Sequence, residues 1–263
     1  MKKLTFLVLV SLFTSALFAQ DIELSEAELK TKLDSVLNEG NLLYQYERAA
    51  WVATDLAMGN PELKTDIIGF LAYEDQAAMK VIFIGKQSQN CIAEYSFQNE
   101  FDKPKSTVIE SRELSAKEKG LLELRGKIFQ NIGDPQYEVV VPEGYDLNFV
   151  LLPFGEKYKF YILTGTSQAH TIPFGNDYLF ITDKNGTIES RQKFHSRMVA
   201  TEVTENTEKL VHSHLKTTPF ITPTDICTFK LYAPFCYGID EFSVYASGKY
   251  MKYSRKSNTI SIE

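Results

Sequence analysis

The sequence is poor in cysteine, with 3 in 263 residues. So few cysteines exclude a disulfide-stabilised scaffold, and their spacing excludes a Cys-x-x-Cys redox or zinc motif. Cys227 and Cys236 lie close enough in the sequence to pair after export. The apolar neighbours of Cys227 favour the other alternative, a buried free thiol. The sequence leaves both alternatives open.

Clusters of basic residues are also missing. The chain has 28 Lys and Arg against 34 Asp and Glu, with a net charge of −6. This balance argues against binding to nucleic acid or to an anionic membrane surface. The sequence also lacks a glycine-rich nucleotide loop, a serine-centred nucleophile elbow and an internal repeat.

Long apolar runs are confined to the N-terminus. Met1–Ala19 begins with two lysines, continues through the apolar stretch 4–10 and ends on a small residue, and no acidic residue precedes Asp21. This pattern predicts a secretory signal peptide that is cleaved after Ala19. The segment is too short for a stable membrane anchor, and no cysteine follows it for lipidation. We therefore expect a secreted or periplasmic protein without a membrane span after cleavage.

The rest of the chain is typical of an α+β protein. Aromatic residues make up 13% of the sequence, which is enough for a substantial core. We expect an N-terminal α+β module over residues 20–110 and a second domain, a mixed β-sheet with flanking helices, over 111–263. In the module, the apolar spacing predicts two helices separated at Gly40 and then an antiparallel meander; the ranges are 21–38, 41–58, 67–73, 79–85 and 91–97.

The second domain begins with a capping box at Ser115 and Glu118, which predicts a helix to about residue 131. Strands are expected next, and the Asn-Gly pair at 185–186 predicts a hairpin between the last two; the ranges are 148–153, 157–163, 178–182 and 187–194. A final hairpin is expected over 241–245 and 249–253.

The segment 209–232 carries the only clustered metal-binding residue types that we find in the sequence. His212 and His214 lie in a short apolar stretch that reads as a strand. Side chains at alternate positions of a strand point to the same face, so the two imidazoles are expected to converge. A helix is expected to begin near Thr222, with Pro223 in its first turn and Asp225 three residues after the cap.

Asp225 has two interpretations. Thr-x-x-Asp before an apolar run is close to a capping box, so Asp225 is expected at this position for helix geometry alone. Together with His212 and His214, it would also complete a set of three zinc ligands that leaves one position of a tetrahedral ion open. The two interpretations remain alternatives at this stage.

The spacing of these residues resembles the JAMM (MPN-type) metalloprotease signature, His-x-His-Pro-x6-Ser-x-x-Asp. The resemblance implies that His212, His214 and Asp225 hold zinc and that Thr222, in the place of the serine, stabilises the oxyanion. Leu215 replaces the proline of the signature. The expected order of elements, namely a helix, strands, the histidine strand, an aspartate-capped helix and final strands, is also similar to the JAMM fold.

The JAMM resemblance also implies a glutamate upstream that acts as general base. Glu138 is the nearest positional match, and Glu143 and Glu156 are weaker alternatives, although none has the apolar-glycine context that is expected after it. Of the remaining histidines, His170 and His195 are both expected to be exposed, with His195 as the reserve ligand if the site needs a fourth protein group.

These observations predict a zinc-dependent peptidase or amide hydrolase of JAMM-like type that acts on a peptide or protein substrate. The alternative is a non-catalytic secreted binding module with a structural or vestigial metal site, and a third is that Asp225 only caps its helix and no metal binds. Separately, the segments YERAAWVATDL and FGNDYLFITDKNG resemble uncharacterised secreted proteins of Bacteroidetes-type bacteria, a similarity that implies no activity.

Overall fold

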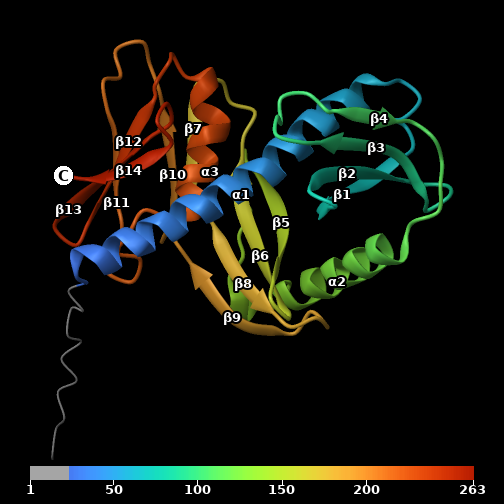
Figure 1. The fold of residues 1–263 in the computed structure, drawn as a ribbon, viewed down its shortest axis with the longest axis horizontal. Helices are drawn as coiled ribbons and strands as arrows, with labels where there is room; N and C mark the ends of the chain where they lie inside the picture. The colour runs from blue at the N-terminus through green and yellow to red at the C-terminus, as the bar shows by residue number, and fades with distance from the viewer. Residues whose placement is uncertain (1–23) are drawn as a thin grey trace, which may run out of the picture.

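The computed structural model describes residues 24–263, and the predicted signal peptide therefore lies outside the described residues. Within this range the chain is α+β, with helices packed among several mostly antiparallel sheets (Figure 1). The helices are α1 Glu26–Gly59, α2 Ala116–Ile132 and α3 Pro223–Tyr232, with short 3-10 turns η1 Pro135–Tyr137 and η2 Ala233–Phe235.

The first sheet is an antiparallel meander of neighbouring strands in the order β1-β2-β3-β4. Its strands are β1 Ile67–Asp75, β2 Ala78–Gly85, β3 Cys91–Phe97 and β4 Ser106–Val108. The three predicted strands of the meander are confirmed almost to the residue. Short polar turns between alternating apolar runs leave antiparallel pairing as the only geometry that the connections can span.

The second sheet is antiparallel in the order β5-β6-β8-β9. Its strands are β5 Asp146–Phe154, β6 Lys157–Gly165, β8 Tyr178–Thr182 and β9 Ile188–Lys193. The predicted hairpin is present: Gly186 has a φ of +84°, and the Asp183 carboxylate accepts hydrogen bonds from the backbone N–H groups of Asn185 and Thr187. A positive φ is accessible to glycine without steric cost, which explains why the Asn-Gly pair predicted this turn.

A two-stranded sheet of β7 Thr171–Gly175 and β10 Met198–Glu202 was not predicted. Every residue of β7 is buried, yet the strand contains Pro173. Proline cannot donate to a sheet ladder and lowers the expectation of a strand, so the short run reads as a loop in the sequence.

The C-terminal sheet has the order β11-β12-β13-β14, and β11 is parallel to β12 whereas the other pairs are antiparallel. Its strands are β11 Leu210–Ser213, β12 Glu241–Ala246, β13 Lys249–Ser254 and β14 Thr259–Ile262. Helix α3 makes the crossover between the two parallel strands. The predicted final hairpin is confirmed as β12 and β13, and β14 is an additional strand.

The prediction of two N-terminal helices separated at Gly40 is wrong, because α1 is one continuous helix. Gly40 is buried in its middle against α3. A Cβ atom at this position would lie 2.8 Å from Cβ of Ile226 and 3.0 Å from the carbonyl oxygen of Pro223. The glycine is therefore explained by the close approach of two helices, and the hydrogen bonds of the helix continue through it.

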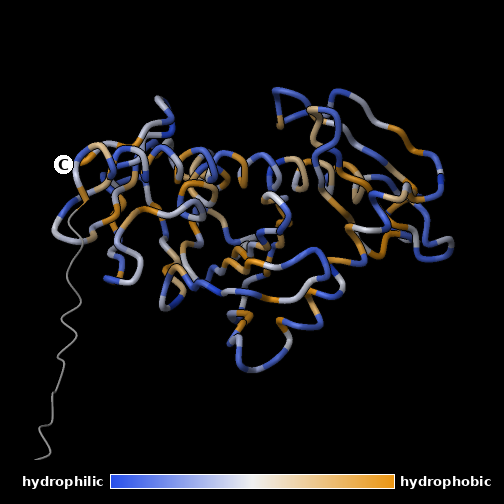
Figure 2. Tube along the Cα trace, turned by 60° about the horizontal axis from the view of Figure 1, so that its bottom comes forward, coloured by the Kyte–Doolittle hydropathy of each residue, from blue (hydrophilic) through white to orange (hydrophobic). Residues whose placement is uncertain are grey.

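Helix α1 connects the parts of the molecule. It crosses from the C-terminal strands to the β1–β4 sheet in Figure 1, and it packs directly on α3. Its buried residues share one hydrophobic cluster with residues of both sheets, including Phe83 and Phe242. The loops that project from the elements are mainly hydrophilic in Figure 2. No helix among residues 24–263 is long and apolar enough to cross a membrane.

Candidate metal centre

Strand β11 brings His212 and His214 together as the sequence predicted. His212 lies opposite Val244 of the parallel strand β12, and the backbone N–H of His214 donates to the carbonyl of Tyr245 just beyond the strand end. Both side chains therefore point to the same face of the sheet, and their Nε2 atoms lie 3.1 Å apart.

Asp225 caps its helix, and its position leaves it free to serve in the second role that the sequence suggested as well. Thr222 is the N-cap of α3, and the Asp225 Oδ2 atom accepts from the Thr222 backbone N–H at 2.8 Å and from its hydroxyl at 2.7 Å. The other oxygen, Oδ1, faces the histidines and lies 3.2 Å from His212 Nε2. One carboxylate thus caps the helix and extends into the histidine cluster.

A third histidine, His195, completes the cluster. It lies in the segment between β9 and β10, and its Nε2 atom is 3.4 Å from His212 Nε2 and 3.2 Å from Asp225 Oδ1. The prediction that His195 is exposed is wrong, since only 4% of its side chain is exposed. No spacing motif connects it to the other ligands, because the contact depends on how the β9–β10 segment crosses β11.

The outer nitrogens of the histidines are held by other groups. His195 Nδ1 lies 2.7 Å from Asp177 Oδ1, and the Thr224 hydroxyl donates to the other oxygen of Asp177. His214 Nδ1 lies 2.7 Å from the carbonyl oxygen of Phe220, which fixes a proton on that nitrogen. These contacts leave the Nε2 lone pairs for the centre of the cluster, an arrangement that is common around metal-bound histidines. No pattern in the sequence pointed to Asp177.

The charges of the cluster are strongly coupled. Burial opposes the charged form of His195, but Asp177 and Asp225 outweigh it and raise its pKa to about 11. Burial and the neighbouring imidazoles lower the pKa of His214. Burial also opposes the charged form of Asp225, yet the three histidines hold its pKa well below the usual range. The centre is therefore built around a buried carboxylate that needs a cation beside it.

These residues fit a zinc ion. The four ligand atoms lie within 4.8 Å of one another, and the side chains are at most 7% exposed. Ligands at about 2.0–2.1 Å from a tetrahedral zinc are separated by roughly 3.3 Å. Four pairs of ligand atoms match this value at 3.1–3.4 Å, namely His212 Nε2 with each of the other three and His195 Nε2 with Asp225 Oδ1. Asp225 Oδ1 is buried and has no hydrogen-bond partner among the described residues. An orphaned buried oxygen facing imidazoles is what a metal ligand would leave.

The other predicted site residues lie apart from this centre or have other contacts. Glu138, the proposed general base, follows η1 and is not part of the cluster; its carboxylate is 74% exposed and lies 3.5 Å from an Arg191 nitrogen. Glu143 and Glu156 are also exposed. The Thr222 hydroxyl is already bonded to Asp225. His170 stacks on Tyr237 with ring centroids 4.2 Å apart, away from the other histidines.

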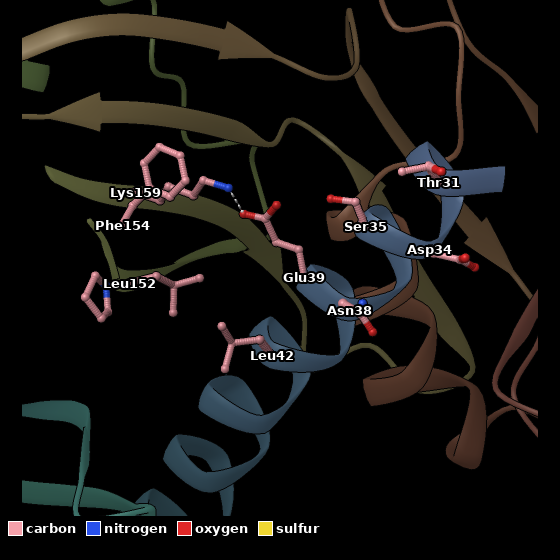
Figure 3. Close-up of a pocket in the computed structure, with 10 residues that line it drawn as sticks. Thr31, Asp34, Ser35, Asn38, Glu39, Leu42, Leu152, Phe154 and Lys159 are labelled. Atoms are coloured by element: carbon pink, nitrogen blue, oxygen red, sulfur yellow. Dashed lines mark hydrogen bonds and ion pairs between the residues drawn. The ribbon is translucent and has the colours of Figure 1, made fainter. Parts of the chain in front are cut away.

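Two hollows lie near the centre without reaching its ligand atoms. One of about 330 Å³ is bounded by Phe220 and Thr222, the residues that support His214 and Asp225. Another of about 580 Å³ continues along α1, and there Lys159 reaches across to Glu39 at 2.5 Å (Figure 3). The ligands themselves line neither hollow.

Comparison with known proteins leaves this geometry as the basis for any assignment: no protein-family model matches the chain, and no match is found among curated proteins or solved structures.

Proposed function

We propose that this protein binds one zinc ion through His195, His212, His214 and Asp225, and that the ion has a structural role. The observation that carries the proposal is the buried set of four protein ligand atoms around an unpartnered carboxylate oxygen. Structural zinc sites are closed by four protein ligands, whereas catalytic sites keep one position for water or substrate. The ligands come from the β9–β10 segment, β11 and α3, so the ion would connect three separate parts of the fold.

Metal content and stability test this proposal together. Protein purified without chelator should contain about one zinc per chain by elemental analysis, and removal of the zinc should lower the Tm because the ion binds only the folded state. His212→Ala should abolish the zinc, while His170→Ala, which changes the histidine outside the cluster, should retain it. Absence of zinc after reconstitution at neutral pH would contradict the proposal.

A second candidate is a zinc-dependent peptidase or amide hydrolase of JAMM-like type, and the pairing of His195 with Asp177 favours it. In this function His212, His214 and Asp225 would hold the ion, which would supply Lewis acidity to the reaction. His195, oriented through Nδ1 by Asp177, would be the acid–base group beside the ion, in place of the Glu138 that the sequence suggested. The JAMM-like assignment rests on the spacing of the motif and on the order of α2, the strands, β11 and α3.

His195→Gln separates the two functions. If the site is structural, this variant loses its zinc and has a lower Tm. The zinc-loaded wild type then cleaves none of a panel of peptide substrates. If the site is catalytic, the variant retains zinc with three ligands, and its peptidase activity is lower than that of the wild type by about 100-fold or more. The secreted or periplasmic location belongs to the same proposal and rests on Met1–Ala19; processing after Ala19 in exported protein would support it.

A further inference from the structure

A further cavity lies where side chains of the three hydrophobic clusters approach one another. The cavity has a volume of about 550 Å³. Tyr46 of α1 belongs to the first cluster, Leu124 and Leu151 to the second, and Leu71 to the third.

The floor and the rim of this cavity differ in chemistry. Its floor consists of buried apolar side chains and tyrosine rings, whereas exposed Lys117 and Lys184 and one carboxylate, Glu74, lie at its rim. Lys117 is already engaged, with its Nζ 3.0 Å from Asp75 Oδ1 and 2.8 Å from the Glu74 carbonyl. Lys184 makes no ion pair within residues 24–263. An apolar cavity with a lysine at its rim that forms no ion pair in the described part of the chain is suited to an amphiphilic anion.

Addition of a peptide strand to the cavity is disfavoured. Strand β1 forms one wall and is the edge of its sheet, so its outer carbonyls would have to pair with an incoming strand. Two of them are taken: Phe70 O accepts from Arg125 at 2.6 Å, and Glu74 O accepts from Lys117. The Tyr46 hydroxyl is bonded to the Glu74 backbone as well. A ligand without backbone groups of its own fits this edge better.

We infer that this cavity binds a long-chain aliphatic carboxylate, a free fatty acid, with its chain between α2 and strands β1 and β5 and its carboxylate near Lys184. The volume lies within the range of roughly 300–1,000 Å³ that is typical of small-molecule sites. Leu121 of α2 packs against both the second and the third cluster. An inserted chain would therefore lie along side chains of all three clusters.

Two glycines of α2 provide a matched test. Gly120 lines the cavity and Gly126 does not, and at both positions an added Cβ has no heavy atom within 4 Å. Leucine should therefore be tolerated at each position and should favour the helix equally. Gly120→Leu places its side chain at the cavity, whereas Gly126→Leu leaves the cavity unchanged.

Binding is measured by the fluorescence of cis-parinaric acid and its displacement by palmitate, with the full mature chain. We expect saturable binding of one molecule per chain. Gly120→Leu should weaken it about tenfold or more, because excluding even two methylene groups has this effect, and Gly126→Leu should match the wild type. Lys184→Gln should weaken palmitate binding by about twofold to fivefold and leave displacement by hexadecanol unchanged. No saturable binding to the wild type, or equal binding by the two leucine variants, would overturn the inference.

Discussion

Gly40 of α1 lies directly against Ile226 of α3, with space for hydrogen but not for a methyl group. Ile226 is the next residue after Asp225, so this contact determines how closely the start of α3, and with it the carboxylate of the metal centre, approaches α1. The packing of the longest helix and the geometry of the candidate site are therefore coupled.

Gly40→Ala should destabilise the protein even though alanine favours helices. The new methyl group would overlap Ile226 and the Pro223 carbonyl, and overpacking of this kind costs on the order of 1–3 kcal/mol. Urea unfolding measures the effect. Gly59→Ala, at the end of the same helix and with open space around its Cβ, is the control and should be neutral or slightly stabilising. Equal stability of both variants would show that α1 and α3 are not in close contact.

Most of the regular elements were predictable because their signals are local. The capping box of Ser115 and Glu118 and the Asn-Gly turn before Thr187 act within a few residues, so sequence patterns predict them. The role of Gly40 was not predictable, since a glycine that ends a helix and one that admits another helix look the same in the sequence. Only the approach of α3, more than 180 positions later, distinguishes them.

The residues of the candidate site also fall into a group that local sequence signals predict and a group that they do not. His212, His214 and Asp225 were predictable because one strand and one helix start bring them together. His195 was named only as a reserve ligand and was expected to be exposed, and Asp177 was not named at all. Their positions depend on the packing of the unpredicted β7–β10 pair against β11. Three ligands alone would leave one coordination position open, and in the structure His195 is the fourth residue of the cluster.

Asp177→Asn should weaken zinc binding by roughly 10- to 100-fold, as loss of a carboxylate behind a metal-binding histidine does in other proteins. The asparagine oxygen can still accept from His195 Nδ1, so the fold should persist while the imidazole becomes a weaker donor. Competition with a chromophoric chelator measures the affinity. Asp34→Asn, on the exposed face of α1, should bind zinc like the wild type. An unchanged affinity in Asp177→Asn would mean that His195 is not a ligand.

Thr222→Ala and Thr222→Ser test what the hydroxyl does. If it caps α3 and orients Asp225, alanine should cost about 1 kcal/mol of stability and weaken zinc binding, while serine should preserve both. If it stabilises an oxyanion, as the JAMM resemblance implies, alanine should lower hydrolytic activity and leave zinc affinity unchanged. Parallel measurement of unfolding, zinc affinity and peptidase activity separates these outcomes.

Glu47 should make folding stability depend on pH near neutrality. Burial raises its pKa to about 7, which the hydrogen bond from Asn148 opposes only in part. The native state therefore keeps a proton that the unfolded state releases above about pH 4.5, so stability falls as the pH rises from about 4.5 to about 7 and then levels off.

The Glu47→Gln variant measures this contribution, because glutamine resembles the protonated acid. In metal-free protein the two forms should be similar in stability near pH 4.5, and the variant should be more stable by about 3 kcal/mol at pH 8. Taking the difference between the two proteins removes the contribution of the histidines, which they share. A difference that does not change with pH would place Glu47 in contact with water.

The most direct test of the four-ligand zinc centre is the zinc affinity and stoichiometry of metal-free wild-type protein, measured by chelator competition beside His195→Ala and His170→Ala. Four ligands predict about one zinc per chain in the wild type and in His170→Ala, with an affinity that falls by several orders of magnitude in His195→Ala. Retention of the wild-type affinity in His195→Ala, or no binding by the wild type, would contradict this account.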